Sequence, residues 1–407
     1  MTSSDAGAPS TVGAPRYLVL LLAAFTSLVV LTTDVYLPVL PQLSADLGVS
    51  DAVAAATVSM VLIGIAAGQI VVGPLSDAVG RRGPLLLGTL AYALTHVLSA
   101  IAPNGPALLT ARALAGLATA AVVVTARAVV ADVFHGPGSA RAYATLGAVM
   151  AIAPVVAPVL GGLLANVMSW RGMFLVLAGL ALVLAAVGWR ALPETLPPDR
   201  RVPPHLGAVL ADLGSVLRIR RFLAYVAVIA AFGALLFGYI GASSFVLQEQ
   251  FDLGPTAYSL VFAANSVGIF VLSNVSRHLV SRVEPGTLLG VGHLVSLVGV
   301  VLLGLGVGAS LLWLVLLGLL LAVSALGLIM PAAQALGMAE APGRAGSASG
   351  VIGISQFTVG AIASPLAGLG GSAWSFVAVL AAGAVAGPVL LRLLLHGTRP
   401  TTSLERS

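Results

Sequence analysis

The feature that most constrains this chain is a series of apolar blocks, each about twenty residues long, that runs from one end to the other. A helix of that length crosses the hydrocarbon core of a bilayer. Inside lipid the backbone must satisfy its own hydrogen bonds, which leaves helices and closed barrels as spanning structures. The blocks therefore predict an all-α membrane protein whose twelve transmembrane helices cover residues 17–40, 52–72, 84–102, 106–131, 141–165, 171–192, 222–247, 255–276, 286–306, 311–336, 345–369 and 371–395.

The composition agrees with this assignment and excludes several functions. Of the 407 residues, 59% are hydrophobic and 8% are charged, whereas soluble domains carry about 25% charged residues. The chain has no cysteine, which excludes disulfides, thiolate metal sites and thiol catalysis. Its basic residues are spread over the loops, which argues against nucleic-acid binding, and no G-x-x-x-x-G-K-S/T motif for ATP occurs. We expect no cofactor, no metal and no enzyme activity.

A polar segment at 193–221 divides the twelve spans into six and six. Its leucines at helical spacing predict a short amphipathic helix on the membrane surface: Leu206, Leu210, Leu213 and Leu217. Two six-span halves joined in this way are typical of transporters built from parallel repeats. The predicted units are an N-terminal tail at 1–16, a six-helix bundle at 17–192, a linker at 193–221, a second six-helix bundle at 222–395 and a tail at 396–407.

The arginines predict the orientation, because loops on the cytoplasmic side of a membrane carry an excess of Lys and Arg. With the N-terminus inside, the outer loops carry Arg171 alone, and Arg112 and Arg127 lie within the fourth span. The others fall on the cytoplasmic side: Arg16, Arg81, Arg82, Arg141, Arg190, Arg200, Arg201, Arg218, Arg220, Arg221, Arg277, Arg282, Arg344, Arg392, Arg399 and Arg406. We therefore expect a multi-pass protein of a bacterial cytoplasmic membrane, with both termini in the cytoplasm.

Asp34 is the one acidic residue placed deep within a predicted span. Burying a charge at mid-membrane is costly, so such a residue is a candidate for function by default. Pro38 and Pro41 follow it and should loosen the helix, which frees backbone carbonyls near the acid. One interpretation is a protonation or cation-binding site, and the other is a structural carboxylate paired with a neighbouring helix.

Arg112 is the basic counterpart, in the outer half of the fourth span. Its guanidinium cannot lose its charge, so it needs an acceptor such as a carboxylate, a substrate oxygen or backbone carbonyls. The alternative is that the side chain extends to the outer headgroups. Asp34 and Arg112 are together the candidates for proton coupling.

Further polar and aromatic residues lie on spans that would surround a central cavity. The candidates for substrate contact are Tyr36, Met60, Met150, Tyr239, Asn265, Gln334 and Gln356. Packing between helices is an equally good interpretation of each one. His96 and His293 are also embedded in spans, but they lack metal-ligand spacing, and we interpret them as packing residues.

The loop between the second and third spans reads GPLSDAVGRRG. Its glycines permit a tight turn between antiparallel helices, and Asp77 can accept hydrogen bonds from a helix N-terminus or an arginine. Arg127 and Asp132, at the inner end of the fourth span, lie on the same side of the membrane. We predict a conformational gate that consists of Gly73, Asp77, Gly80, Arg81, Arg82, Arg127 and Asp132.

The fifth span contains the segment GAVMAIAPVVAPVLGG. Two prolines four residues apart remove helix hydrogen bonds and bend the helix, whereas glycines allow close contact between helices. The ordered set is Gly147, Pro154, Pro158, Gly161 and Gly162.

With these motifs the chain resembles the major facilitator superfamily, and within it the Bcr/CflA group of drug:proton antiporters. The resemblance covers nearly all of the chain and rests on TDVYLPVLPQL, GQIVVGPLSDAVGRRGPLL, ARALAG, RAVVAD, APVVAPVLGG, SWRGMF, LPETL and RRF, in that order. It implies the fold of two six-helix bundles that alternate their access.

The resemblance also implies roles for particular residues. Asp34 matches the membrane acid of proton coupling, and Arg112 matches the arginine of the fourth span. The loop at 73–82 matches the one that latches the two halves, and the fifth-span set matches an antiporter signature. Many relatives carry Arg-Asp where this chain has Ala131-Asp132, so the lock would rely on Arg127 alone.

The function implied is proton-coupled efflux of small amphipathic antibiotics, neutral or cationic. The stretches TDVYLP and LPETL look closest to exporters of phenicols such as chloramphenicol. The expected partners are the drug, protons and the lipid bilayer, and we expect a monomer. The alternative transport function is proton-driven import or export of a small endogenous metabolite. A membrane-embedded enzyme and a non-transporting sensor on the same fold are the alternatives outside transport.

Overall fold

The computed structural model describes residues 16–134, 137–201, 206–279, 282–342 and 344–396, and every regular element in these ranges is a helix. Twelve helices are long and apolar enough to cross a membrane, which confirms the predicted all-α membrane fold. The elements are α1 (Arg16–Asp34), η1 (Leu37–Val39), α2 (Leu40–Leu47), α3 (Asp51–Val79), α4 (Arg82–Ala100), α5 (Gly105–Val133), α6 (Pro137–Leu164), α7 (Trp170–Ala191), η2 (Pro198–Arg200), α8 (Leu206–Val216), α9 (Arg220–Phe245), η3 (Val246–Gln250), α10 (Pro255–Leu279), α11 (Pro285–Gly308), α12 (Leu312–Ser324), α13 (Leu326–Ala339), α14 (Ala345–Ala367), η4 (Leu369–Gly371) and α15 (Ala373–Leu395).

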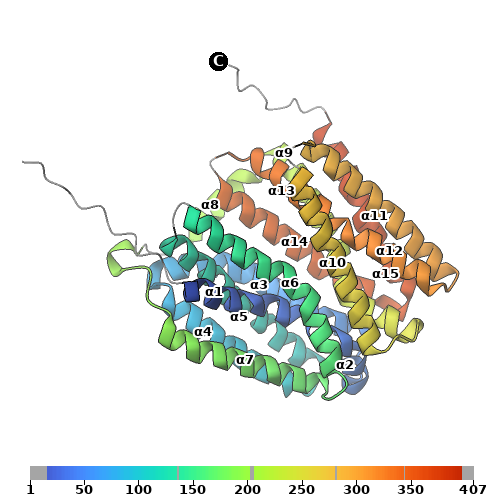
Figure 1. Cartoon of the computed structure of the whole chain (residues 1–407), viewed down its shortest axis with the longest axis horizontal. Helices are drawn as coiled ribbons and strands as arrows, with labels where there is room; N and C mark the ends of the chain where they lie inside the picture. Colours follow the sequence, from blue (N-terminus) through green and yellow to red (C-terminus); the bar gives the residue numbers. More distant parts are fainter. Residues whose placement is uncertain (1–15, 135–136, 202–205, 280–281, 343, 397–407) are drawn as a thin grey trace, which may run out of the picture.

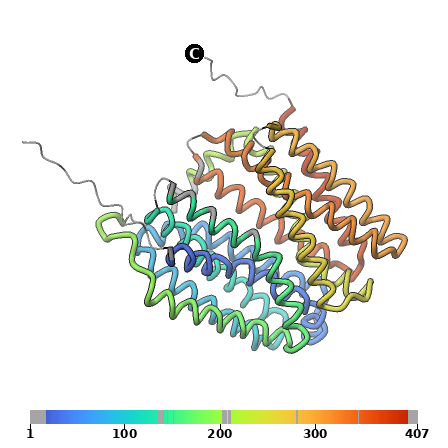
Figure 2. The backbone as a smooth tube through the Cα atoms, in the orientation of Figure 1, coloured from blue at the N-terminus to red at the C-terminus, as the bar shows by residue number. Residues whose placement is uncertain are grey.

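The helices pack as two groups, coloured blue to green and yellow to red in Figure 1 and Figure 2. In the first half, α3 and α4 pack on α5, α4 packs on α7, and α1 packs on α6. In the second half, α14 and α15 pack on α9, and α11 packs on α12 and α13. Each half therefore supplies most of the contacts of its own helices.

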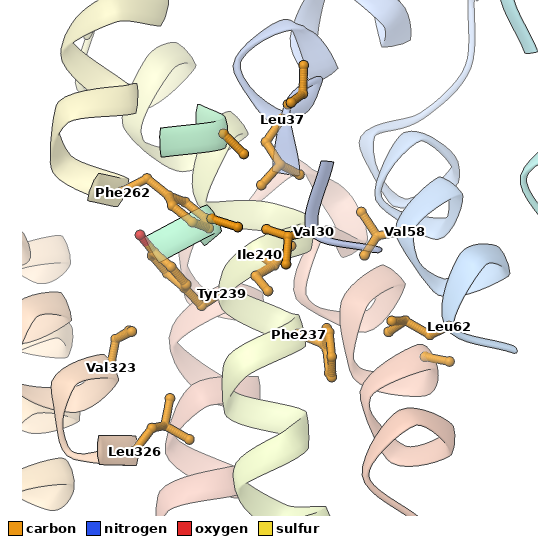
Figure 3. Packing of buried hydrophobic residues seen from close by; sticks show 14 of the residues in the cluster. Val30, Leu37, Val58, Leu62, Phe237, Tyr239, Ile240, Phe262, Val323 and Leu326 are labelled. Atoms are coloured by element: carbon orange, nitrogen blue, oxygen red, sulfur yellow. The ribbon is translucent and has the colours of Figure 1, made fainter. Parts of the chain in front are cut away.

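Two helix pairs carry most of the contact between the halves, α3 with α14 and α6 with α10. Buried apolar residues from both halves belong to one continuous cluster, of which Figure 3 shows Leu37 and Val58 from the first half and Phe237, Ile240 and Phe262 from the second. Because these side chains are almost fully buried, the two halves are held together at their centre by apolar packing.

The two ends of the molecule differ. We call the end at which α7 ends and α9 begins the linker end. The end of α3 lies there too, since the backbone N–H of Arg81 donates to Glu194 of the linker over 2.8 Å. Helix α8 packs on α14 and on α3, one helix from each half. The predicted helix in the linker is therefore present, although the side chains of Leu206 and Leu210 lie outside the described residues.

At the opposite, far end, the first span breaks just after Asp34. Helix α1 ends at Asp34, a short 3₁₀ turn follows at Leu37–Val39, and α2 continues to Leu47. This is the loosening that Pro38 and Pro41 predict, because neither proline can donate a backbone hydrogen bond. The first spanning segment consequently runs from Tyr17 to Leu47, seven residues beyond its expected end at 40.

The carbonyls freed by this break join the two halves. The Ser244 hydroxyl donates to the Leu37 carbonyl over 2.7 Å, and the Gln248 amide donates to the Pro38 carbonyl over 3.0 Å. Nearby, Ser364 of α14 donates to the Ala55 carbonyl of α3 over 3.0 Å. The far end is thus closed by hydrogen bonds from side chains of the second half to backbone of the first.

Candidate functional site

A cavity of about 320 Å³ lies between the two halves, and we call it the central pocket. Its walls are Val29, Ile65, Gln69, Thr119, Ala120, Val123, Val124, Arg127, Met150, Gln334, Ser349, Gly350, Ile352, Gly353, Gln356 and Phe357. Arg127 stands six residues before the end of α5, and Gly350 lies against Leu213 of α8. Both positions are close to the linker end, so the pocket occupies that side of the molecule while the far end is closed.

The pocket has the composition of a small-molecule site. Apolar side chains make up much of its surface, and three glutamine amides with two hydroxyl residues supply hydrogen-bonding groups. Sites for small ligands combine a largely apolar wall with a few placed polar groups in this way. The amides come from both halves, Gln69 from α3, Gln334 from α13 and Gln356 from α14. A ligand bound here would contact both halves at once.

The predicted cavity residues divide into two sets. Met150, Gln334 and Gln356 line the central pocket. Tyr36, Met60, Tyr239 and Asn265 do not line it. The Tyr36 hydroxyl is within 2.9 Å of the Thr57 hydroxyl, and the Asn265 amide donates to the Tyr239 hydroxyl over 2.9 Å, so Tyr36, Tyr239 and Asn265 join neighbouring helices instead.

Sequence reasoning missed Gln69, Thr119 and Ser349, and it assigned Arg127 to the gate and not to the pocket. Gln69 carried a usable signal, because an amide within an otherwise apolar span needs a polar partner or a polar cavity. Thr119 and Ser349 carried none, since hydroxyl groups in membrane helices often bond to their own backbone, as Thr119 does to the Ala115 carbonyl over 2.7 Å.

Asp34 is buried where the two halves meet, and its side chain is not part of the pocket wall. Within the part of the chain that the structure describes, it forms no ion pair. The hydroxyl of the neighbouring Thr33 donates to the Val30 carbonyl over 3.1 Å. Asp34 also lies near enough to the hydroxyls of Tyr239 and Tyr258, in the second half, for its charge to interact with both. Asp34 therefore lies close to tyrosines of the second half.

Arg112 is fully buried and points toward α1, not toward the outer headgroups. Its Nη2 donates to the Thr32 carbonyl over 2.5 Å, and the guanidinium lies 4.6 Å from the centre of the Tyr36 ring and 5.0 Å from that of Phe174. Cation–π contacts of this kind stabilise a desolvated guanidinium. Arg112 thereby ties α5 to the last turn of α1, two residues before Asp34, without an ion pair to the acid.

The loop between α3 and α4 forms a network of charged contacts at the linker end. The Arg81 guanidinium bonds Asp77 over 2.6 Å and Asp132 over 2.9 Å, and only 8% of its side chain is exposed. Asp132 thus joins the loop through Arg81, as a gate that includes Asp132 requires. Within the described residues Arg127 forms no ion pair, and its side chain is exposed on the pocket wall.

The linker residue Glu194 completes this network. Its carboxylate accepts from the backbone N–H of Arg81 over 2.8 Å and from that of Arg82 over 3.3 Å, which caps the N-terminus of α4. Burial acts to raise the pKa of Glu194, but the hydrogen bonds from four backbone N–H groups outweigh it and lower that pKa below its ordinary value. This capping gives the LPETL motif a structural role.

Gly80 is required by the same arrangement. It ends α3 with a φ of +102°, a conformation that side chains other than glycine rarely adopt. A Cβ at this position would also meet the Glu194 carboxylate. In contrast, Gly73 has open space around it, so its place in the motif has no packing explanation in this conformation.

In α6, the two adjacent glycines face different partners. A Cβ at Gly161 would overlap the Val35 carbonyl oxygen of the first half, whereas one at Gly162 would overlap Ser259 of α10 in the second half. Pro154 and Pro158 lie inside the helix, as predicted. Gly147 has no atom near the position of a Cβ. Gly162 is therefore the glycine that allows α6 to approach the other half.

Sequence comparison decides the family. The sequence model of the Major Facilitator Superfamily matches residues 20–365 of the chain. The chain belongs to the Major Facilitator Superfamily. It is 31% identical over 342 residues to the MFS-type transporter YdgK of Bacillus subtilis, covering 83% of this chain and 85% of that one. It is 30% identical over 286 residues to a chloramphenicol resistance protein of Pseudomonas aeruginosa, covering 70% of this chain and 67% of that one.

Among solved structures, the fold is similar to an inward-facing, occupied bacterial homolog of the human lysosomal transporter Spinster, with a TM-score of 0.76. The alignment covers 95% of this chain and 98% of that chain at 15% identity, and it therefore shows the shared fold alone. The chain is thus a multi-pass membrane transporter of this superfamily, with antibiotic resistance proteins among its relatives.

Proposed function

We propose that this transporter exports small amphipathic antibiotics in exchange for protons across a bacterial cytoplasmic membrane. The observation that carries the proposal is the presence of two separate sites between the halves. Residues of both halves line a pocket that carries glutamine amides, and the buried carboxyl group of Asp34, which has no ionic partner in the described chain, lies at the interface. Similarity to a chloramphenicol resistance protein supports a phenicol-like cargo.

The arginine distribution supports a cytoplasmic location for the linker end and for both termini. The structure would then be the inward-facing state, in which the central pocket receives a molecule from the cytoplasm. Closure of the linker end and opening of the far end would follow as the two bundles, 17–192 and 222–395, rock about their shared core. We propose that a single copy of the chain carries out this cycle.

In this mechanism Asp34 holds the coupled proton. When the far end is open, a proton from outside neutralises Asp34, and release of the cargo accompanies this step. The neutral side chain no longer penalises apolar contact with the second half, so the far end can close around it. Release of the proton to the cytoplasm then restores the charged form for the next cycle. Arg112 would act as a positioning residue, because it fixes the turn that precedes Asp34.

The test is proton-driven transport of chloramphenicol in vesicles that contain the wild-type chain or the variant Asp34→Asn. Because the amide preserves shape but cannot titrate, we expect the variant to fold and to lose uphill export. Proton release on drug binding to the purified protein should disappear with it. The matched control is Asp252→Asn, the same chemical change at an exposed loop position. Full gradient-driven export by Asp34→Asn would remove Asp34 from the coupling role.

A further inference from the structure

The central pocket carries charge of one sign, which is positive. Among the sixteen described residues that line it, Arg127 is the only charged one, and none is Asp or Glu. The guanidinium keeps its charge at any physiological pH. A pocket that bound organic cations would need a carboxylate or an open aromatic face near the bound charge. Phe357 is the only aromatic residue on this wall, and the cation of Arg127 shares the same space.

Arg127 is also available for a ligand. The acidic residue nearest to it along α5, Asp132, bonds the Arg81 guanidinium over 2.9 Å and accepts from the Thr195 hydroxyl over 3.1 Å. In the described part of the chain, Arg127 has no acidic partner and its side chain is exposed on the pocket wall. A guanidinium in this position presents free donors to whatever enters the pocket.

We propose that Arg127 binds the cargo directly, through an anionic or hydrogen-bond-accepting oxygen group such as a carboxylate, sulfonate or nitro group. The central pocket therefore selects neutral and anionic amphipathic molecules and disfavours cations. This deepens the proposed function and rests on it. It differs from the expectation from sequence, which allowed neutral or cationic cargo and placed Arg127 in the gate.

The rest of the wall fits such a molecule. Gln334 and Gln356, from the second half, can each donate and accept a hydrogen bond, which suits amide, hydroxyl and carbonyl groups. Met150 and Phe357 offer adaptable apolar surface for an aromatic ring. Arg127 comes from the first half and the two amides from the second, so a molecule held at both ends would connect the halves.

The experiment measures binding of three probes to the purified full chain in lipid nanodiscs: neutral chloramphenicol, its anionic hemisuccinate ester and the cation tetraphenylphosphonium. For the wild-type chain we expect the cation to bind at least tenfold more weakly than the other two probes. In Arg127→Gln, affinity for the hemisuccinate should fall by tenfold or more, that for chloramphenicol by a few-fold, and that for the cation should rise. Arg127→Lys should recover most of the hemisuccinate affinity.

The control variant is Arg277→Gln, which removes an exposed arginine at the end of α10, away from the pocket wall. It should leave all three affinities unchanged. A role for Arg127 in gating would instead change the three affinities by the same factor, with an altered accessibility of the far end, and that result would overturn the proposal. Tight binding of the cation to the wild-type chain, unaffected by Arg127→Gln, would overturn it as well.

These outcomes separate the pocket from the coupling, because binding is measured without a proton gradient. Charge-selective binding through Arg127 in a protein that shows no proton-driven export supports the pocket and overturns the proposed antiport. Proton-driven export of tetraphenylphosphonium that Arg127→Gln does not alter keeps the antiport and overturns the pocket assignment. Failure to bind any of the three probes overturns both.

Discussion

Gly162 offers a direct test of how the two halves meet at the far end. A Cβ at this position would lie 2.7 Å from the Cβ of Ser259 and would overlap its hydroxyl, so the Gly162→Ala change must push α6 away from α10. Overpacking of this kind costs about 1–3 kcal/mol. We expect the penalty to fall on the conformation in which the far end is closed, because α6 and α10 meet at Gly162 in that conformation. Because each 1.4 kcal/mol is about a tenfold change in an equilibrium, the population with an open far end should rise on the order of tenfold.

The assay exploits the absence of cysteine in the natural chain. A single cysteine replacing Ser364, which is fully buried and bonds across the halves, serves as the only thiol. Its rate of alkylation reports opening of the far end, and every variant carries the same background change. We expect faster labelling in Gly162→Ala, still faster labelling in Gly162→Leu, and slower drug export in both, with unchanged amounts of protein in the membrane.

Gly161→Ala is the matched control, because its added methyl would overlap the Val35 carbonyl within the first half and not the second half. It adds the same methyl group without adding to the contact between α6 and α10, so we expect it to raise labelling less than Gly162→Ala does. The second change Ser259→Gly, which removes the overlapping atoms, should return labelling of Gly162→Ala toward the parent rate. Equal labelling of the parent and of both Gly162 variants, with export intact, would refute the close-packing argument.

Two further predictions concern the linker end. Glu194→Gln should weaken the cap of α4 by about 1 kcal/mol at neutral pH and lower the midpoint of thermal unfolding. The lowered pKa of Glu194 means that the wild-type chain has this stabilisation above the unfolded value of about 4.3 and loses it as the pH falls through the folded-state value. The difference between the two proteins should therefore vanish in acid, and a gap that persists there would contradict the charge argument. Asp77→Asn should slow the transport cycle and leave the affinity for chloramphenicol within a few-fold of that of the wild-type chain, since the contact of Asp77 with Arg81 lies off the pocket wall. A large loss of affinity, with unchanged accessibility of the two ends to labelling, would argue that Asp77 binds the drug directly.

The architecture could be predicted from the sequence because length and polarity alone set the number of spans. The break after Asp34 could likewise be predicted, from the two prolines that follow it. The hydrogen bonds that the break allows between the halves could not, because only the packed structure shows that Ser244 and Gln248 reach the carbonyls of the break. The first span was placed too short for a related reason: the chain resumes helical structure after the break, although Pro41 and the polar Gln42 suggest an end.

The candidate site was harder to predict, because helical periodicity does not say which neighbour a buried face meets. Met150, Gln356, Tyr36 and Tyr239 were all predicted to line the cavity from positions on membrane spans. Met150 and Gln356 line the pocket, whereas Tyr36 and Tyr239 bond to residues of other helices. The individual partners within the predicted gate were equally hidden, because the turn at Gly80 brings Arg81 to Asp132 across 51 positions in sequence.

Under the proposed proton exchange, the separation of Asp34 from the pocket wall has an electrical consequence. The coupled proton and the cargo would occupy different sites, so both charges count toward the net charge moved in each cycle. With one proton entering per molecule expelled, a neutral cargo moves one net positive charge inward, an anion moves two and a cation moves none. Each such charge is worth about 2.3 kcal/mol per 100 mV of membrane potential. In an alkaline medium, where the pH gradient collapses but the potential remains, expulsion of neutral and anionic compounds would still be driven, and expulsion of cations would stop.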